Sequence, residues 1–314
     1  MQNWQTTYLG LKELPRELST FELQTFFTFS RAERTVIGAR HGATHKLGLA
    51  LHIGFLRMSG RSLNAIRIVP VALWAHLGKE LDVRAPELAS LKALYGRRST
   101  LFEHQQLAEH TLGFRGMTEH QNRAFVQVLR NEAASLPDKD QMLVFARRWL
   151  YDHKFLIESK RAFNTQITTA LDLFETQTGE IIAATVRSDL MDKWRRTLAE
   201  LRPNGQIQQS WLWEAPAKHS TVQIAQVFER IDLLYSLDVH KHLGNLTDLI
   251  VRRYARQLAN RSPSVSARIK EPRRTVEVAC FQRYCLFTTT DQAILMIQRR
   301  VTDLWRMARE EVPD

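Results

Sequence analysis

The strongest constraint on the fold of this chain is a helix-start signal that recurs early in the sequence. The segments at Ser19 and Ser30 both read S-x-x-E, a pattern in which the serine and glutamate side chains accept hydrogen bonds from the first backbone N–H groups of a helix. Gly42 and Gly60 follow as stop signals, because glycine readily adopts the left-handed conformation that ends helices. These signals predict short helices joined by tight turns.

The segment between the two glycines predicts a helix inside a hydrophobic core. Thr44 is expected to cap this helix. Its apolar residues fall on nearly every side of the helix, which is typical of a buried element: Leu47, Leu49, Leu51, Ile53, Phe55 and Leu56. Three helices with such short connections form a unit of helix-turn-helix type.

A second group of short helices is predicted next. Pro70 precedes one helix, Pro86 fits the first turn of another, and Thr100 with Glu103 supplies a further capping box before a helix that Gly113 closes. Beyond residue 155 the helical pattern continues with longer helices, and strand-like alternation is nearly absent. We therefore expect an all-α fold with tandem small helical domains over 1–68 and 69–157, followed by a longer helical region over 158–314.

The charge of the chain favours a polyanionic partner. Its 44 Lys+Arg against 33 Asp+Glu give a net charge of +11, while 44% hydrophobic residues are typical of a folded protein. Arginine forms forked contacts with phosphates and guanine edges, which favours a nucleic acid. The alternative is a basic protein that is merely soluble.

Cysteine content and hydropathy predict a soluble protein of a reduced, intracellular compartment. Only Cys280 and Cys285 occur, too few for a zinc finger, and buried free thiols are expected. The longest apolar stretch, 47–58, is too short to span a bilayer. No membrane contact is expected.

Basic residues gather at the predicted helix joints, where small helical DNA-binding units present cations to a duplex. The first group consists of Arg31, Arg34, Arg40, His41, His45 and Lys46, with Arg57 and Arg61 beyond it. The second consists of Arg97, Arg98, Ser99, Thr100, His104, Gln105 and Arg115. Backbone N–H groups at helix starts would add to these phosphate contacts.

Each group also has a purely structural interpretation. The first can be a solvated basic face, and in the second Ser99 and Thr100 can simply cap a helix that carries His104 on its surface. A third group can be a charged outer helix face or a further contact with the DNA backbone: Arg252, Arg253, Arg256, Arg261, Arg268, Lys270, Arg273 and Arg274.

Catalytic motifs are not found in the sequence. Carboxylates are scattered among the predicted helices, and no G-x-S-x-G, P-loop, HExxH or GxGxxG pattern occurs. The chain is therefore expected to have no active site and to need no metal or other cofactor.

Several segments resemble the Tn3 family of transposases. The stretch LSTFELQTFFTFSRAERTVIGARHGATHKLGLALHIGFLRMSGRSL is similar to the family's opening segment, with Lys46 in place of an arginine before Leu-Gly. The stretch ALYGRRSTLFEHQQLAEHTLGFR resembles the next signature, and WLWEAPAKHS, VFERIDLLYSLDV, EPRRTVEVACFQRY and TTTDQAILMIQRRV also fit. The similarity covers essentially the whole chain.

The resemblance implies a non-catalytic part of a DDE-type transposase that binds the terminal inverted repeats of a replicative transposable element. It implies that the region 158–314 serves as a linker or dimerisation region, with a homodimer in the full-length protein and possible further DNA contacts. It also implies that the RNase H-like domain, with its acidic triad and Mg²⁺, belongs to a part not included here. The expected location is the bacterial cytoplasm, in association with the nucleoid.

Two alternatives remain open. The chain could be a stand-alone regulator that binds the same transposon ends without cleaving them. It could also be a helical scaffold whose basic face meets an acidic protein or RNA.

Overall fold

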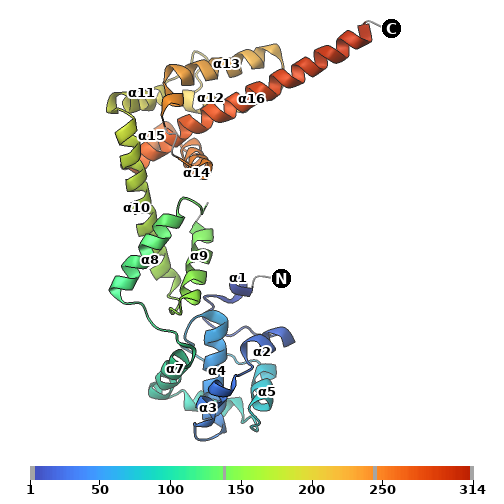
Figure 1. The fold of residues 1–314 in the computed structure, drawn as a ribbon, viewed down its shortest axis with the longest axis vertical. Helices are drawn as coiled ribbons and strands as arrows, with labels where there is room; N and C mark the ends of the chain where they lie inside the picture. Colours follow the sequence, from blue (N-terminus) through green and yellow to red (C-terminus); the bar gives the residue numbers. More distant parts are fainter. Residues whose placement is uncertain (1–3, 137–138, 243–245, 312–314) are drawn as a thin grey trace. The chain divides into compact units, whose positions relative to one another are not determined.

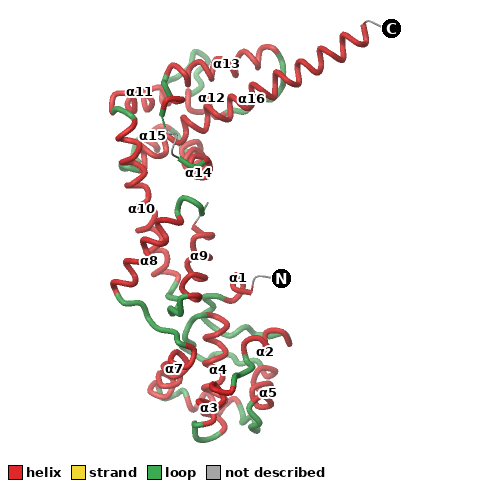
Figure 2. The backbone as a smooth tube through the Cα atoms, viewed as in Figure 1, coloured by secondary structure: helices red, strands yellow, loops and turns green. Residues whose placement is uncertain are grey.

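The computed structural model describes residues 4–136, 139–242 and 246–311, and in these ranges the fold is all-α, as predicted (Figures 1 and 2). Within the described ranges the β-type pairing is limited to two isolated bridges, Arg115 with Phe155 and Leu201 with Ile207. The chain divides into two compact units. Unit 1 holds Met1–Leu129 and Asp138–Thr168, and unit 2 holds Arg130–Pro137 and Thr169–Asp314.

Unit 1 is built around one central helix, α4. The helices α2, α3, α5, α6 and α7 all contact α4, and Figure 1 shows α2, α3, α5 and α7 around it. The helices that contribute to unit 1 are α1 (Trp4–Tyr8), α2 (Thr20–Phe26), α3 (Arg31–Gly38), α4 (Ala43–Ser59), α5 (Val71–Glu80), α6 (Leu88–Leu94), α7 (Arg98–Leu112), α8 (Glu119–Glu132), α9 (Lys139–Asp152) and the start of α10 (Lys160–Thr185).

The first two capping boxes form as predicted, but the third does not. The side chains of Ser19 and Ser30 accept hydrogen bonds from the backbone N–H groups of Glu22 and Glu33, the third residues of α2 and α3. The glutamate side chains in turn accept from the backbone N–H groups of the two serines. Helix α4 begins after Gly42 without a side-chain cap, so Thr44 lies inside its first turn. The predicted Thr100 box is wrong for the same reason: α7 begins at Arg98, and Thr100 already belongs to its first turn.

Two glycines of α4 allow neighbouring chain segments to approach its backbone. A Cβ at Gly54 would overlap the ring of Phe27, and one at Gly48 would lie 2.6 Å from Tyr95 Oη. Leu47 and Leu51 of α4 share one core with Leu73 and Leu91, which come from the predicted second domain. The assignment of 1–68 and 69–157 to separate DNA-binding domains stays a prediction.

Unit 2 has its own core, in which Trp194, Trp211, Tyr254 and Phe281 pack among aliphatic side chains. Trp194 and Tyr254 are fully buried, and Trp194 Nε1 donates to the carbonyl of Leu237 at 2.8 Å. Cys280 and Cys285 are buried free thiols, and burial raises the pKa of both. After the second part of α10, the unit contains α11 (Ser188–Ala199), α12 (Gln208–Trp213), α13 (Thr221–Ser236), a 3-10 turn (Val239–Lys241), α14 (Asp248–Ala259), α15 (Pro263–Ser266) and α16 (Arg273–Glu311). No helix of the described ranges is long and apolar enough to cross a membrane.

Candidate nucleic-acid interface

Several of the basic residues predicted to contact DNA fall at two opposite ends of α4. Helix α3 runs back along α4, because Glu33 near the start of α3 forms an ion pair with Arg57 near the end of α4, at 2.6 Å. At 1.5 Å per residue, α4 is roughly 25 Å long. Arg31 and Arg34 therefore lie far from His45 and Lys46, which occupy the first turn of α4.

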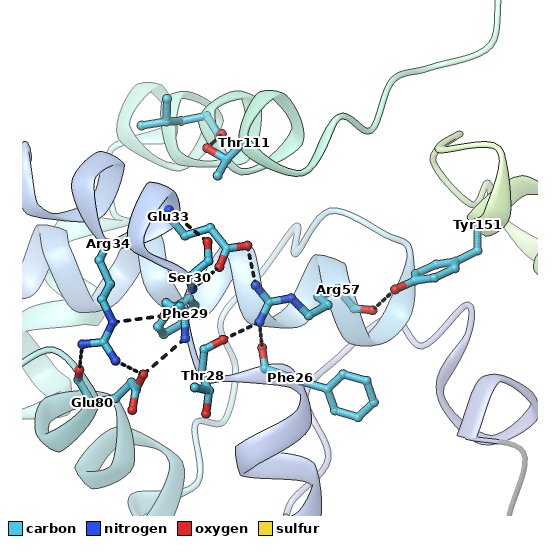
Figure 3. A network of polar contacts seen from close by, with 11 residues as sticks. Phe26, Thr28, Phe29, Ser30, Glu33, Arg34, Arg57, Glu80, Thr111 and Tyr151 are labelled. Atoms are coloured by element: carbon cyan, nitrogen blue, oxygen red, sulfur yellow. Dashed lines mark hydrogen bonds and ion pairs between the residues drawn. The ribbon is translucent and has the colours of Figure 1, made fainter.

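Arg57, near the end of α4, donates hydrogen bonds to several acceptors (Figure 3). We call Arg57 with its partners Phe26, Thr28 and Glu33 the Arg57 network. Arg57 Nη1 donates to the carbonyls of Phe26 and Thr28, each at 2.8 Å, and its Nη2 to Glu33 Oε1. Burial by itself would raise the pKa of Glu33, but hydrogen bonds from the Ser30 backbone and from Arg57 outweigh it, and the pKa is lowered. The network thus ties the α2–α3 turn to α4.

Arg34 is held in the same region (Figure 3). Its Nε donates to the carbonyl of Phe29 at 3.0 Å, while its two Nη atoms bind the carboxylate and the carbonyl of Glu80. Arg61, also predicted to contact DNA, donates to the carbonyl of Glu158 at 2.8 Å. These arginines stabilise the contacts between helices of unit 1.

At the other end of α4, the first turn lies beside the first turns of α7. Arg40, just before α4, pairs with Glu103 of α7, and the rings of His45 and His104 have centroids 5.6 Å apart. Ser62, beyond the end of α4, bonds to Glu109 further along α7. The two helices thus run in the same general direction, and their N-terminal turns lie at the same end of the pair.

Both of these N-terminal turns are free to bind an anion. Gly42 and Arg97 stand at the cap positions of α4 and α7, neither provides a side-chain cap, and neither helix has an acidic residue in its first turn. Arg97 and Arg98 are exposed, and their side chains find no acceptor among the described residues. Uncapped N–H groups together with the helix dipole attract negative charge. We call this region, with its side chains His41, His45, Lys46, Arg97 and Arg98, the cationic surface.

Buried imidazoles lie beneath the cationic surface. His104 and His52 are almost completely buried, and Tyr95 Oη is 2.8 Å from His104 Nδ1. Burial, together with nearby positive charge, lowers the pKa of His52 to about 3 and that of His104 to about 4, so both are neutral near pH 7. The sequence predicted that His104 contacts a DNA base. In the structure its side chain lies in the core of unit 1.

The remaining residues that were predicted to contact DNA lie at separate places in unit 1. Arg31 is exposed beside the Arg57 network, and Gln105 donates to the carbonyl of Leu63 at 2.9 Å. Ser99 and Thr100 lie in the first turn of α7, exposed and half-buried respectively. Arg115 is exposed, with its guanidinium 5.2 Å from the centroid of the Phe155 ring.

The third basic group, in unit 2, divides between internal and external roles. Arg261 and Arg273 both pair with Glu277, whose side chain is fully buried. Arg252 and Arg256 are exposed on one face of α14. A buried carboxylate without these partners would carry a large desolvation cost, so the internal pair stabilises unit 2.

Comparison with known proteins gives the chain its relatives. Residues 5–170 match the family described as "Domain of unknown function (DUF4158)". This span nearly coincides with unit 1, whose last residue is Thr168. The matched family therefore covers nearly all of unit 1, together with residues 130–137, which belong to unit 2.

The full-length relatives are transposases. The chain is 62% identical over 313 residues to the transposase for insertion sequence element IS1071 in transposon Tn5271 of Comamonas testosteroni, covering 100% of this chain and 32% of that protein. It is 24% identical to the transposase for transposon Tn3926 and 26% identical to that for Tn21, both of Escherichia coli, with 92% of this chain and 29% of each relative covered. The chain spans about a third of the length of the relatives it matches.

Proposed function

The chain belongs to the Tn3 family of transposases, and from this premise we propose that its cationic surface binds double-stranded DNA at the terminal inverted repeats of a transposon. In this proposal the chain supplies recognition in replicative transposition and carries no catalytic group itself. Binding and cleavage would then belong to different parts of the longer transposase. Unit 1 would position the DNA end for the reaction.

The observation that supports the proposal most is the convergence of the two uncapped helix starts. The first turns of α4 and α7 together offer the backbone N–H groups of Ala43, Thr44, His45, Arg98, Ser99 and Thr100, for which the described residues provide no acceptor. A phosphate oxygen is a strong acceptor for such groups, and half or more of protein–DNA hydrogen bonds go to the DNA backbone.

The exposed arginines add charge and reach to these backbone groups. Arg97 precedes α7 in an extended conformation and Arg98 opens the helix, so their side chains emerge beside the free N–H groups. A guanidinium binds a phosphate or a guanine edge through two parallel hydrogen bonds. Arg97 and Arg98 are accordingly the residues that we expect to contribute most to affinity.

Gel-shift titration tests the proposal most simply. The chain is titrated against a duplex carrying the element's inverted repeat and against a duplex with the same bases in scrambled order. We expect tighter binding to the repeat, and a weaker complex when Arg97 and Arg98 are both replaced by Ala. Unchanged affinity of this double variant would remove the cationic surface from the account.

The same titration separates the alternatives. Equal affinity for a scrambled duplex or for RNA would favour a helical scaffold with a general polyanion partner. A reading frame that ends at Asp314 in the source genome would favour a stand-alone regulator, whereas continuation into an acidic-triad domain would exclude it. The Mg²⁺ of such a domain and the homodimer of the full-length protein both stay predictions.

A further inference from the structure

Unit 2 contains a small cavity that the proposed function does not use. It lies where α11, α12, the end of α14, α15 and the first turns of α16 meet, and its volume is about 80 Å³. A single water needs roughly 10–15 Å³ of such volume, so the cavity has room for a larger group. Its lining is apolar except for four polar residues, which are Arg195, Gln209, Ser266 and Arg274.

Two buried polar atoms on the lining residues have no partner. Ser266 is 8% exposed, and its Oγ is buried without a hydrogen-bond partner among the described residues. Arg195 lines the same cavity, and its Nε is also buried and unpartnered. An unsatisfied buried donor destabilises the fold, and a bound acceptor would offset that cost.

A third donor comes from the first turns of α16. Arg274 lines the cavity half-buried, and its guanidinium finds no acceptor among the described residues. The amide Nε2 of Gln209 is already used, since it donates to the carbonyls of Leu258 and Arg261 at 3.0 and 2.9 Å. The unpartnered groups that remain are therefore Arg195 Nε, the Arg274 guanidinium and the Ser266 hydroxyl.

The charge of the lining selects for a negative ligand. Within the described residues, no carboxylate lines this cavity. Asp192 and Glu271, which line a separate cavity of about 630 Å³, bind the Nη atoms of Arg195 at 3.2 and 2.6 Å. Thr275 Oγ1 also accepts from Arg195 Nη2 at 2.8 Å, so only the Nε of Arg195 is left for a ligand. Exposed Arg268 and Lys270, which follow Ser266, add to the positive potential around the cavity.

We propose that this cavity is a binding site for one tetrahedral oxyanion, a phosphate group, held by Arg195, Arg274 and Ser266. The Arg274 guanidinium, the Nε–H of Arg195 and the Ser266 hydroxyl can each donate to a phosphate oxygen, and the charged donors make these hydrogen bonds strong. The site belongs entirely to unit 2 and does not depend on DNA binding by the cationic surface. The phosphate can come from solution or from a nucleic-acid backbone.

Calorimetric titration of the full chain with inorganic phosphate, at constant ionic strength set by chloride, tests the proposal. We expect saturable binding of one phosphate, and at least about ten-fold weaker binding in Arg274→Gln, because a charge-assisted hydrogen bond is lost. Ser266→Ala should weaken binding by a smaller factor. Among the described residues neither side chain has a hydrogen-bond partner, so both variants should fold, as thermal unfolding without phosphate would verify.

The matched control is Arg252→Gln, which removes an equally charged, exposed side chain of unit 2 that does not line the cavity. Its phosphate affinity should be unchanged. No saturable phosphate binding, or an equal loss in Arg252→Gln and Arg274→Gln, would overturn the proposal.

A second arm identifies the source of the phosphate. A short duplex of unrelated sequence is titrated in the presence and absence of inorganic phosphate. If the site holds a backbone phosphate, Arg274→Gln weakens duplex binding and free phosphate competes with the duplex. If the site holds free phosphate, neither Arg274→Gln nor added phosphate changes duplex binding, while the parent chain still binds inorganic phosphate in the calorimeter. This result does not depend on DNA binding by the cationic surface.

Discussion

The two ends of α4 use the same type of residue for different purposes. At its C-terminal end, Arg34 and Arg57 are bound by carboxylates and backbone carbonyls, and Glu33 has a lowered pKa (Figure 3). At its N-terminal end, Arg97 and Arg98 have no acceptor among the described residues, and two helix starts beside them are uncapped. The first arrangement fixes helices in place, and the second is available to a ligand.

A cluster of arginines along a sequence therefore does not by itself define a binding surface. Glu80, which pairs with Arg34, lies 46 residues away in the chain, and Glu103, which pairs with Arg40, lies 63 residues away. Such partners are brought in by tertiary structure. Only the arginines that remain without partners after folding are free to attract phosphates.

Acidification should have the largest effect on stability. It should destabilise the core around His52 and His104 at a higher pH than it weakens the Arg57 network. The folded pKa values of His52 and His104, about 3 and about 4, lie below the ordinary value of 6.5. Stability is therefore fully present above pH 6.5 and is lost as the pH falls from there toward 4, because the unfolded chain binds more protons. The expected loss at pH 5 is about 2 kcal/mol for each histidine.

Urea unfolding at pH 7.5 and pH 5 measures this loss. In contrast, the Arg57 network should weaken only below about pH 4.5, since the pKa of Glu33 is lowered from that value. His52→Gln, which cannot be protonated, should reduce the loss between the two pH values by about half, in line with one histidine fewer. Equal stability of the parent chain at both pH values would show that the two imidazoles are not buried as described.

Removal of Arg57 should give the next largest effect. Arg57→Ala leaves the Glu33 carboxylate and the carbonyls of Phe26 and Thr28 without their donor. We expect a loss of about 2–3 kcal/mol in the free energy of unfolding, since one partner of a largely buried ion pair is removed. Urea unfolding at pH 7.5 measures it, with exposed Arg31→Ala as a control that should change stability by less than about 0.5 kcal/mol. A comparable loss in both variants would contradict the contrast between bound and free arginines.

The smallest effect on stability is expected from the ion pair of Arg40, which lies beside the cationic surface. Glu103→Gln removes the negative partner of Arg40, a pair whose side chains are partly exposed. Stability should change by less than about 1 kcal/mol, as for exposed ion pairs. DNA affinity should rise about two- to five-fold, because an arginine is released and a carboxylate near the phosphates is removed.

The binding arm of this experiment is a gel-shift titration at low salt. Glu109→Gln serves as a comparison further along α7, where the carboxylate bonds to Ser62. Its effect on affinity should be smaller than that of Glu103→Gln. Weaker DNA binding by Glu103→Gln would mean that Arg40 contributes through its ion pair and not as a free cation.

Local sequence signals predicted the helices well where a side chain reaches its own backbone. The boxes at Ser19 and Ser30 formed because both partners lie within four residues of each other. The Thr100 box failed, since α7 starts earlier, at Arg98, and takes Thr100 into its first turn. The buried apolar helix over 47–56 was predicted because its composition leaves no face for solvent.

The candidate interface was less predictable for a physical reason. Burial of His104 depends on Tyr95 and on α4, neither of which the sequence of α7 reveals. Which arginines remain unpaired depends on long-range ion pairs. The cationic surface therefore retains Arg97 and Arg98 from the sequence-based set, while Arg34 and Arg57 belong to the structural contacts.

The salt dependence of DNA binding reports how many phosphates the arginines of the cationic surface contact. The logarithm of the association constant for an inverted-repeat duplex is plotted against the logarithm of salt concentration for the parent chain, Arg97→Gln/Arg98→Gln and Arg31→Gln. We expect the slope of the double variant to fall by about 2, one for each lost phosphate contact. Arg31→Gln should keep the parent slope, because the exposed Arg31 lies at the opposite end of α4 from the cationic surface. An unchanged slope in the double variant, or an equal reduction per arginine in Arg31→Gln, would contradict it.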